Sequence, residues 1–314
     1  MYDKLKLWVD RDVIGDSMPQ ISSYLDGCKT VYDNTTGETR VYGSLDGLKV
    51  TTNIGGVSII GSLAKFYHNN NILPLDCAST ELAMEMLSDR LHIDVNSAKI
   101  SSLEFGTHFS MIEPVPRYID LLGESPRLRR LRCTDNTLYY RSKGKNEYKV
   151  HTFYDKRAEV LKQGGVMPID IDDENLLRFE LRFNRQLNQQ LNVSDLRGAT
   201  LYDEAFYQAM VARYCNTYSS INKKRDLKTN IMDKIGTVTD AYEVLVAHLL
   251  NNANQDEITA FIEDLKRSKT FADPKSYSRL KAKIKSVASK VDLTETNDLI
   301  KELDTKIKEV QDRV

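Results

Sequence analysis

The chain has 314 residues, a mass of 35.9 kDa and a formal net charge of −1, so it is long enough for two domains with hydrophobic cores. Its 41% hydrophobic and 28% charged residues are typical of a globular protein, and no apolar run reaches the ~18–20 residues of a membrane span. The start lacks the apolar region of a signal peptide and the four cysteines show no disulfide or metal spacing, so we expect a cytoplasmic protein with reduced thiols.

The first 190 or so residues have mainly strand-like patterns. Residues 4–10 alternate between apolar and polar side chains, as a half-buried strand does. Two hairpins are expected, with turns at residues 34–37 and at Gly55-Gly56. A helix is predicted over residues 80–91, with Ser79 or Thr80 as its N-cap. Further elements are expected as strands near residues 99–105, 128–132, 137–141, 148–154 and 176–183, and as a short helix from Pro114 to about Leu122.

Helical patterns dominate after about residue 195. They are predicted over residues 202–230, 236–252, 255–267, 275–290 and 294–313. The expected fold class is therefore α+β, with an N-terminal domain built on an antiparallel sheet (residues 1–194) followed by an all-helical domain (195–314). The last helix carries an apolar stripe of Ile300, Leu303, Ile307, Val310 and Val314. This stripe indicates packing on a neighbouring helix, and the alternative is the seam of a homodimer.

A first polar motif lies on the strand predicted near residues 99–105. Glu104, Gly106 and His108 project from one strand face, where a carboxylate and an imidazole could approach one ion beside a glycine without a side chain. Such oxygen and nitrogen donors suit Mg²⁺ or Mn²⁺. The alternative is a partly buried histidine with its hydrogen bonds satisfied and a surface glutamate.

A second motif runs from Phe153 to Glu159 at the end of another strand. The phenol of Tyr154 ionises near pH ~10, so it needs help to act as a nucleophile. Lys156 and a nearby metal would favour the phenolate and stabilise charge on a phosphorane-like transition state, and Glu159 would serve as a ligand or a base. The alternative is an amphipathic strand end with an edge tyrosine.

The third motif alternates charged and apolar residues, with Arg178, Glu180 and Arg182 on one strand face. It is either a solvated face or a carboxylate that holds a metal between two phosphate-binding arginines. A basic segment from Arg127 to Lys149, with eight Lys or Arg against two acids, could bind single-stranded DNA through its cations and the interleaved Tyr139, Tyr140 and Tyr148. The candidate DNA-binding residues are Arg178, Arg182, Arg129, Arg130, Arg132, Lys143 and Lys145.

Five segments occur together in this order: Gly47–Phe66, Ile100–Phe105, Thr137–Tyr140, Phe153–Glu159 and Leu177–Glu180. Through them the chain resembles the replication initiators of filamentous phages (the gene II/X type) and, more distantly, those of transposase-like rolling-circle plasmids. The resemblance covers about residues 3–190 and implies that Tyr154 becomes covalently joined to DNA, that Glu104 binds a metal, and that Arg178 and Glu180 form the Arg-x-Glu strand. Many rolling-circle nucleases have a His-hydrophobic-His pair, which this sequence lacks.

The resemblance implies a rolling-circle initiator in a bacterial host cell that nicks single- and double-stranded origin DNA through Tyr154. It would leave a 5′-phosphotyrosine and a free 3′-OH, which a host DNA polymerase would extend while a host helicase unwinds the duplex. A second transesterification would rejoin the displaced strand, and a second tyrosine such as Tyr139 or Tyr140 is a candidate for that step. The helical half would bind DNA or mediate oligomerisation. Two alternatives are a non-catalytic origin-binding protein or repressor, with the contact surface at residues 266–290, and a hydrolytic metal nuclease.

Overall fold

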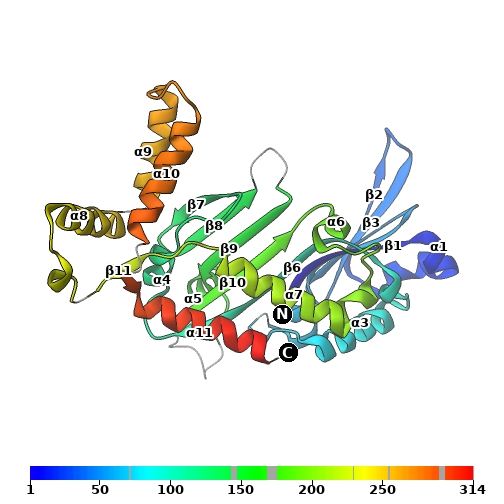
Figure 1. Ribbon diagram of the computed structural model, residues 1–314. Helices are drawn as coiled ribbons and strands as arrows, with labels where there is room; N and C mark the ends of the chain where they lie inside the picture. Colours follow the sequence, from blue (N-terminus) through cyan, green and yellow to red (C-terminus); the bar gives the residue numbers. More distant parts are fainter. Residues whose placement is uncertain are drawn as a thin grey trace.

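The computed structural model describes residues 1–70, 72–142, 147–167, 175–228, 230–253, 255–289 and 294–313. Within them, ten strands form one antiparallel sheet in the order β2-β3-β4-β5-β1-β6-β10-β9-β8-β7 (Figure 1). The strands are β1 (Tyr2–Asp10), β2 (Asp26–Asp33), β3 (Glu38–Leu45), β4 (Leu48–Asn53), β5 (Gly56–Ser62), β6 (Lys99–Met111), β7 (Leu128–Thr134), β8 (Thr137–Ser142), β9 (Lys149–Asp155) and β10 (Asn175–Phe183). Both predicted hairpins and all the predicted strands are confirmed.

The helices follow most of the predicted ranges. They are α1 (Arg11–Ile14), α2 (Leu63–His68), α3 (Cys77–Leu91), α4 (Val115–Leu121), α5 (Lys156–Lys162), α6 (Leu187–Leu191), α7 (Glu204–Ser219), α8 (Val238–Asn252), α9 (Gln255–Arg267), α10 (Lys275–Ala288) and α11 (Asp298–Asp312). The N-cap of α3 was predicted wrongly. Asp76 caps this helix, because its side chain accepts from the Ser79 amide while the Ser79 hydroxyl accepts from the Asp76 amide.

The fold is α+β, as expected, but the C-terminal part is not entirely helical. Helix α7 ends at Ser219 rather than near residue 230, and the chain after it forms a short strand, β11 (Arg225–Leu227), which pairs with β12 (Thr294–Thr296). Arg225 ties them together, since its Nε donates to Thr294 Oγ1 at 2.9 Å. None of the described helices is long and apolar enough to cross a membrane.

Helices α3, α7 and α11 lie across one face of the sheet (Figure 1). Phe105, Phe179 and Tyr214 are fully buried between the sheet and α7. The stripe of α11 from Ile300 to Val310 joins the same core and contacts α7, which confirms packing within the chain rather than a dimer seam for these residues. Val314, the last residue of the predicted stripe, lies outside the described residues. The expected domain boundary after residue 194 stays a prediction, although α7 and α11 share the core of the sheet.

The two ends of the sheet differ. The β2–β3 hairpin forms one edge, and β7 forms the other, where α8, α9 and α10 stand beside the sheet (Figure 1). The face opposite α7 and α11 carries the polar side chains that the sequence motifs predicted, because strand alternation sends Glu104 and Glu180 away from Phe105 and Phe179.

Candidate functional site

The three motifs meet on neighbouring strands in the middle of the sheet. Strand β10 lies between β6 and β9, and its register pairs Arg182 with Glu104 and Arg178 with both His108 and Tyr154. Because paired residues share a face, these side chains project together from the side of the sheet without α7. The face also borders a cleft of about 920 Å³, which Tyr154 and Glu180 line.

Three carboxylates converge in this cleft. Oxygens of Asp3, Glu104 and Glu180 all lie within 4.8 Å of one another, and each residue is less than 10% exposed. Burial, and next the Glu180 charge, raise the pKa of Glu104 to about 7, although Arg182 opposes this. A buried group of three oxygen ligands at this spacing has the donor chemistry that Mg²⁺ or Mn²⁺ requires.

Asp3 was not among the sequence candidates, and a β-bulge explains why. Tyr2 pairs with Phe105 and Leu5 with Leu103, so Asp3 and Lys4 together oppose the single residue Glu104. Bulges of this kind turn side chains toward a site that simple alternation would not give them. Both Asp3 and Lys4 line the cleft, whereas alternation predicts opposite faces.

Two arginines balance much of the negative charge. Arg178 is 3% exposed and donates to Asp3 Oδ2 and Glu180 Oε1, both at 2.6 Å. Arg182 Nε lies 2.5 Å from Glu104 Oε1, and Arg182 Nη2 lies 3.8 Å from Glu180 Oε2. Three carboxylates against two guanidiniums leave one net negative charge when all are ionised. The arginines therefore hold the carboxylates in place, and Arg178 is too buried to serve as a simple phosphate contact.

Tyr154 is directed at this cluster. Its hydroxyl donates to Glu180 Oε1 at 2.8 Å, and burial raises the pKa of Tyr154 well above its usual range. Phe153, on the opposite face, stacks on Phe179 with ring centroids 4.2 Å apart and fixes the strand. Asp155 then ends the strand by capping α5, because its carboxylate accepts from the Ala158 amide at 2.8 Å.

Lys156 and Glu159 form a pair on the first turn of α5. Lys156 Nζ lies 2.7 Å from Glu159 Oε2, and Lys156 is 1% exposed. Burial lowers the pKa of Lys156, and Glu159 lines the cleft. The cation with the largest effect on the Tyr154 pKa is Arg178, not Lys156.

His108 shares the face of Glu104 but is not in the group of side chains within 4.8 Å of one another. Its Cα lies four residues along β6 from that of Glu104, about 13 Å at the usual rise per residue, and two residues beyond Gly106, the partner of Glu180. Burial, helped by Arg178 and Lys156, lowers its pKa to about 4. Its Nδ1 is buried with no hydrogen-bond partner among the described residues. The cluster of possible ligands contains Asp3 where the sequence suggested His108.

The predicted DNA-binding residues of β7 divide between the two faces. Arg130 pairs with the fully buried Tyr140, on the face covered by α4, and its Nε donates to Leu122 O at 3.0 Å. Arg132 shares that face and binds Asp120. Arg129 is exposed on the other face. Lys143 and Lys145 lie outside the described residues.

The tyrosines predicted to stack on bases divide in the same way. Tyr140 is fully buried and donates to Gly123 O at 2.7 Å, so it offers no stacking surface and the expectation for this residue was wrong. Tyr139 lines the cleft of Tyr154. The cleft also has a basic rim that the sequence did not indicate, formed by Lys4, Lys49, Lys65 and Lys162.

No protein-family model and no curated protein matches the sequence. Among solved structures, the fold is similar to one described as the structure of a rolling circle replication initiator protein from Geobacillus stearothermophilus. The identity is 12% and the TM-score 0.42, over 73% of this chain and 88% of that chain. Values at this level do not carry the activity of that protein over to this chain.

Proposed function

We propose that the protein is a metal-dependent nicking and closing enzyme that uses Tyr154 to cut single-stranded DNA at a replication origin. One observation carries the proposal: the Tyr154 hydroxyl donates to Glu180, which is also one of three buried carboxylates within 4.8 Å of one another. A nucleophile, its proton acceptor and a set of metal ligands thus share one cleft.

The chemistry assigned to the chain is a transesterification. The Tyr154 oxygen forms a bond to phosphorus while the bond from phosphorus to the 3′ oxygen breaks. The phenolic proton passes to Glu180 and returns through solvent to the 3′ oxygen. Lys156, whose ammonium is held by Glu159, is proposed to stabilise the negative charge of the transition state. The products are a 5′-phosphotyrosine and a free 3′-OH.

Asp3, Glu104 and Glu180 would hold Mg²⁺ or Mn²⁺, which would polarise the scissile phosphate and make the phenol easier to ionise. Arg178 positions two of these ligands through its bonds to Asp3 and Glu180. Arg182 is partly exposed and lines the cleft, so it is proposed to contact the phosphate together with the basic rim of Lys4, Lys49, Lys65 and Lys162.

The biological setting follows from the resemblance of the sequence motifs to initiators of the filamentous-phage gene II/X type. In that setting the free 3′-OH primes a host polymerase, a host helicase opens the duplex, and a second transesterification closes the displaced strand. Tyr139 is the proposed partner in closing, since it lines the cleft and Tyr140 does not.

The test uses single-stranded oligonucleotides tiled across the genetic element that encodes the protein, with Mg²⁺ or Mn²⁺. We expect a covalent protein–DNA adduct that EDTA prevents, that mass spectrometry maps to Tyr154 and that Tyr154→Phe abolishes. Tyr32→Phe is the matched control, because this phenol is exposed on β2 at the edge of the sheet, away from the cleft. Cleavage that survives in Tyr154→Phe with free ends would instead identify a hydrolytic nuclease. Binding without cleavage under all conditions would identify a repressor or origin-binding protein.

A further inference from the structure

Two basic segments that are far apart in the sequence line one cleft at the β7 edge of the sheet. This edge cleft has a volume of about 1340 Å³ and lies between the β7–β8 hairpin and the helices α9 and α10. Its cations are Arg127, Arg129, Arg130, Arg141, Lys266, Lys281 and Lys285, and its acids are Glu124, Glu147 and Glu263. Seven positive groups against three negative ones favour a polyanion as the ligand.

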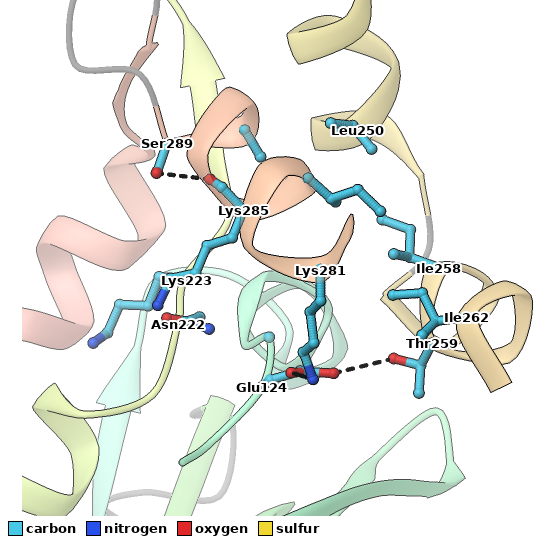
Figure 2. A pocket seen from close by; sticks show the side chains of 13 residues that line it. Glu124, Asn222, Lys223, Leu250, Ile258, Thr259, Ile262, Lys281, Lys285 and Ser289 are labelled. Carbon is cyan, nitrogen blue, oxygen red and sulfur yellow. Dashed lines mark hydrogen bonds and ion pairs between the residues drawn. The ribbon is translucent and has the colours of Figure 1, made fainter. Parts of the chain in front are cut away.

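The helices that form one wall contact the loop that precedes β7. Lys281 of α10 forms an ion pair with Glu124, and Thr259 of α9 donates to the same carboxylate at 3.4 Å (Figure 2). Ile258 and Ile262 of α9 are apolar residues that line an adjoining cavity of about 140 Å³. The wall is therefore held against the loop that precedes β7.

Several of the cations in the edge cleft form no ion pair with the described residues. Arg127, Arg129 and Lys285 are exposed, and no ion pair in the described part of the chain involves them. By contrast, Arg141 is paired with Glu147 and Lys266 with Glu263, both at 2.8 Å. The unpaired cations come from both walls, so a ligand between them would contact α10 and the β7 region at once.

The edge cleft and the cleft of Tyr154 meet at β8, where Tyr139 and Arg141 stand two residues apart on the same face of the strand. The Arg141 guanidinium lies 4.8 Å from the centre of the Tyr139 ring. Arg141 lines the edge cleft and Tyr139 lines the cleft of Tyr154. The sugar-phosphate backbone of a nucleic acid could therefore pass over β8 from one cleft to the other.

We infer that the edge cleft binds the phosphate backbone of the DNA that flanks the strand held at Tyr154. The inference rests on the proposed function for the identity of the polyanion, and it adds a second contact region formed jointly by the sheet edge and the α9–α10 hairpin. Contacts to phosphate fix the position of DNA without reading its sequence, so this region would anchor the origin rather than select it.

The test removes three unpaired cations together, as Arg127→Gln/Arg129→Gln/Lys285→Gln, in the full chain. A matched control removes three exposed cations on other elements that form no ion pair with the described residues, as Arg11→Gln/Lys29→Gln/Lys308→Gln. Affinity is measured between 50 and 200 mM salt for a short single strand around the cleavage site, for the same strand with longer single-stranded flanks, and for a version with duplex flanks. Thermal melting of both variants checks that they fold.

For a flanked substrate, each lost phosphate contact lowers the slope of log affinity against log salt by about 0.7 to 0.9, so the triple variant should lose about 2 to 3. This reduces the affinity drop over that salt range by about 40-fold for duplex flanks. The single- and double-stranded arms show which form of flanking DNA is bound. A slope equal to that of the control, on both flanked substrates, would overturn the inference. Failure of Tyr154 to form an adduct would instead overturn the proposed function and leave this binding result standing.

Discussion

Glu180 Oε1 accepts the hydrogen bond of the Tyr154 hydroxyl at 2.8 Å, and Arg178 Nε reaches the same oxygen at 2.6 Å. The phenolic proton therefore already points at its acceptor. Glu180→Gln keeps the size of the side chain but removes its basicity and its negative charge. We expect the rate of adduct formation to fall by about 10²- to 10⁴-fold, the usual contribution of a general base. Single-turnover adduct formation at saturating DNA and metal measures it.

Glu38→Gln provides the control for this substitution, because Glu38 forms an ion pair with Arg40 on strand β3, away from the Tyr154 hydroxyl. Its adduct rate on a short oligonucleotide should match that of the unaltered protein. If Glu180→Gln also reacted within threefold of the unaltered protein at saturating metal, another group would have to take the proton.

The raised pKa of Glu104 predicts an unusual pH dependence of stability. In the metal-free protein its pKa is about 7 against an ordinary 4.5, so the folded state holds a proton that the unfolded chain has lost between these values. The free energy of unfolding attributable to Glu104 should therefore decrease as pH rises from about 4.5 to 7 and stay constant above it. Glu104→Gln should remove this decrease, as measured by thermal denaturation in EDTA.

Two buried histidines act in the opposite sense. The pKa of His108 is lowered to about 4 and that of His151 to about 3, mainly by burial, so each contributes stability that is lost as pH falls. Only the difference between the unaltered protein and Glu104→Gln isolates the carboxyl group. Parallel pH profiles for the two proteins would show that Glu104 ionises normally in the fold.

The proposed set of metal ligands includes Asp3 and leaves out His108. Asp3→Asn should raise the Mg²⁺ or Mn²⁺ concentration needed for half-maximal adduct formation by at least about 10-fold, since it removes a charged oxygen ligand. His108→Gln should leave this concentration within about twofold, because the imidazole stands outside the carboxylate cluster. Metal titrations of both variants measure the effect directly. An equal loss in both would return His108 to the ligand set.

The motifs around Tyr154 could be predicted because they depend on strand alternation and local capping. In Phe153-Tyr154-Asp155, one side chain enters the core, the next enters the cleft and the third caps a helix. Alternation also placed Glu104 and Glu180 on polar strand faces, and the register then brought them together. These relations extend over a few residues, so the sequence alone indicates them.

Features that depend on pairing between distant strands could not be predicted. Asp3 reaches the cluster only because a bulge in β1 adds a residue opposite Glu104. The basic segment before Lys149 was read as one surface, yet Arg130 and Arg132 face α4 while Arg129 faces the other side. An acidic residue next to an apolar strand near the N-terminus was the available signal for Asp3. No local pattern specifies the bulge.

The last prediction concerns Gly106, which pairs with Glu180 across β6 and β10. A Cβ at this position would lie 2.3 Å from the Phe179 carbonyl oxygen and 2.9 Å from the Glu180 Cα, so the strands must separate to admit it. Gly106→Ala should cost about 1–3 kcal/mol of stability through overpacking. It should also slow adduct formation by 10-fold or more, because Glu180 moves relative to Tyr154 and to the other carboxylates.

Gly43→Ala separates the two effects. A Cβ there would lie 2.8 Å from the Leu25 Cβ, in β3 at the far end of the sheet, so it should destabilise the fold without touching the cleft. Both variants are compared by thermal melting and by adduct formation well below their melting temperatures. If Gly106→Ala loses far more activity than Gly43→Ala at a similar loss of stability, the close fit of the strands around Glu180 is needed for activity. Equal activity in the two variants would show that the cleft tolerates displacement of Glu180.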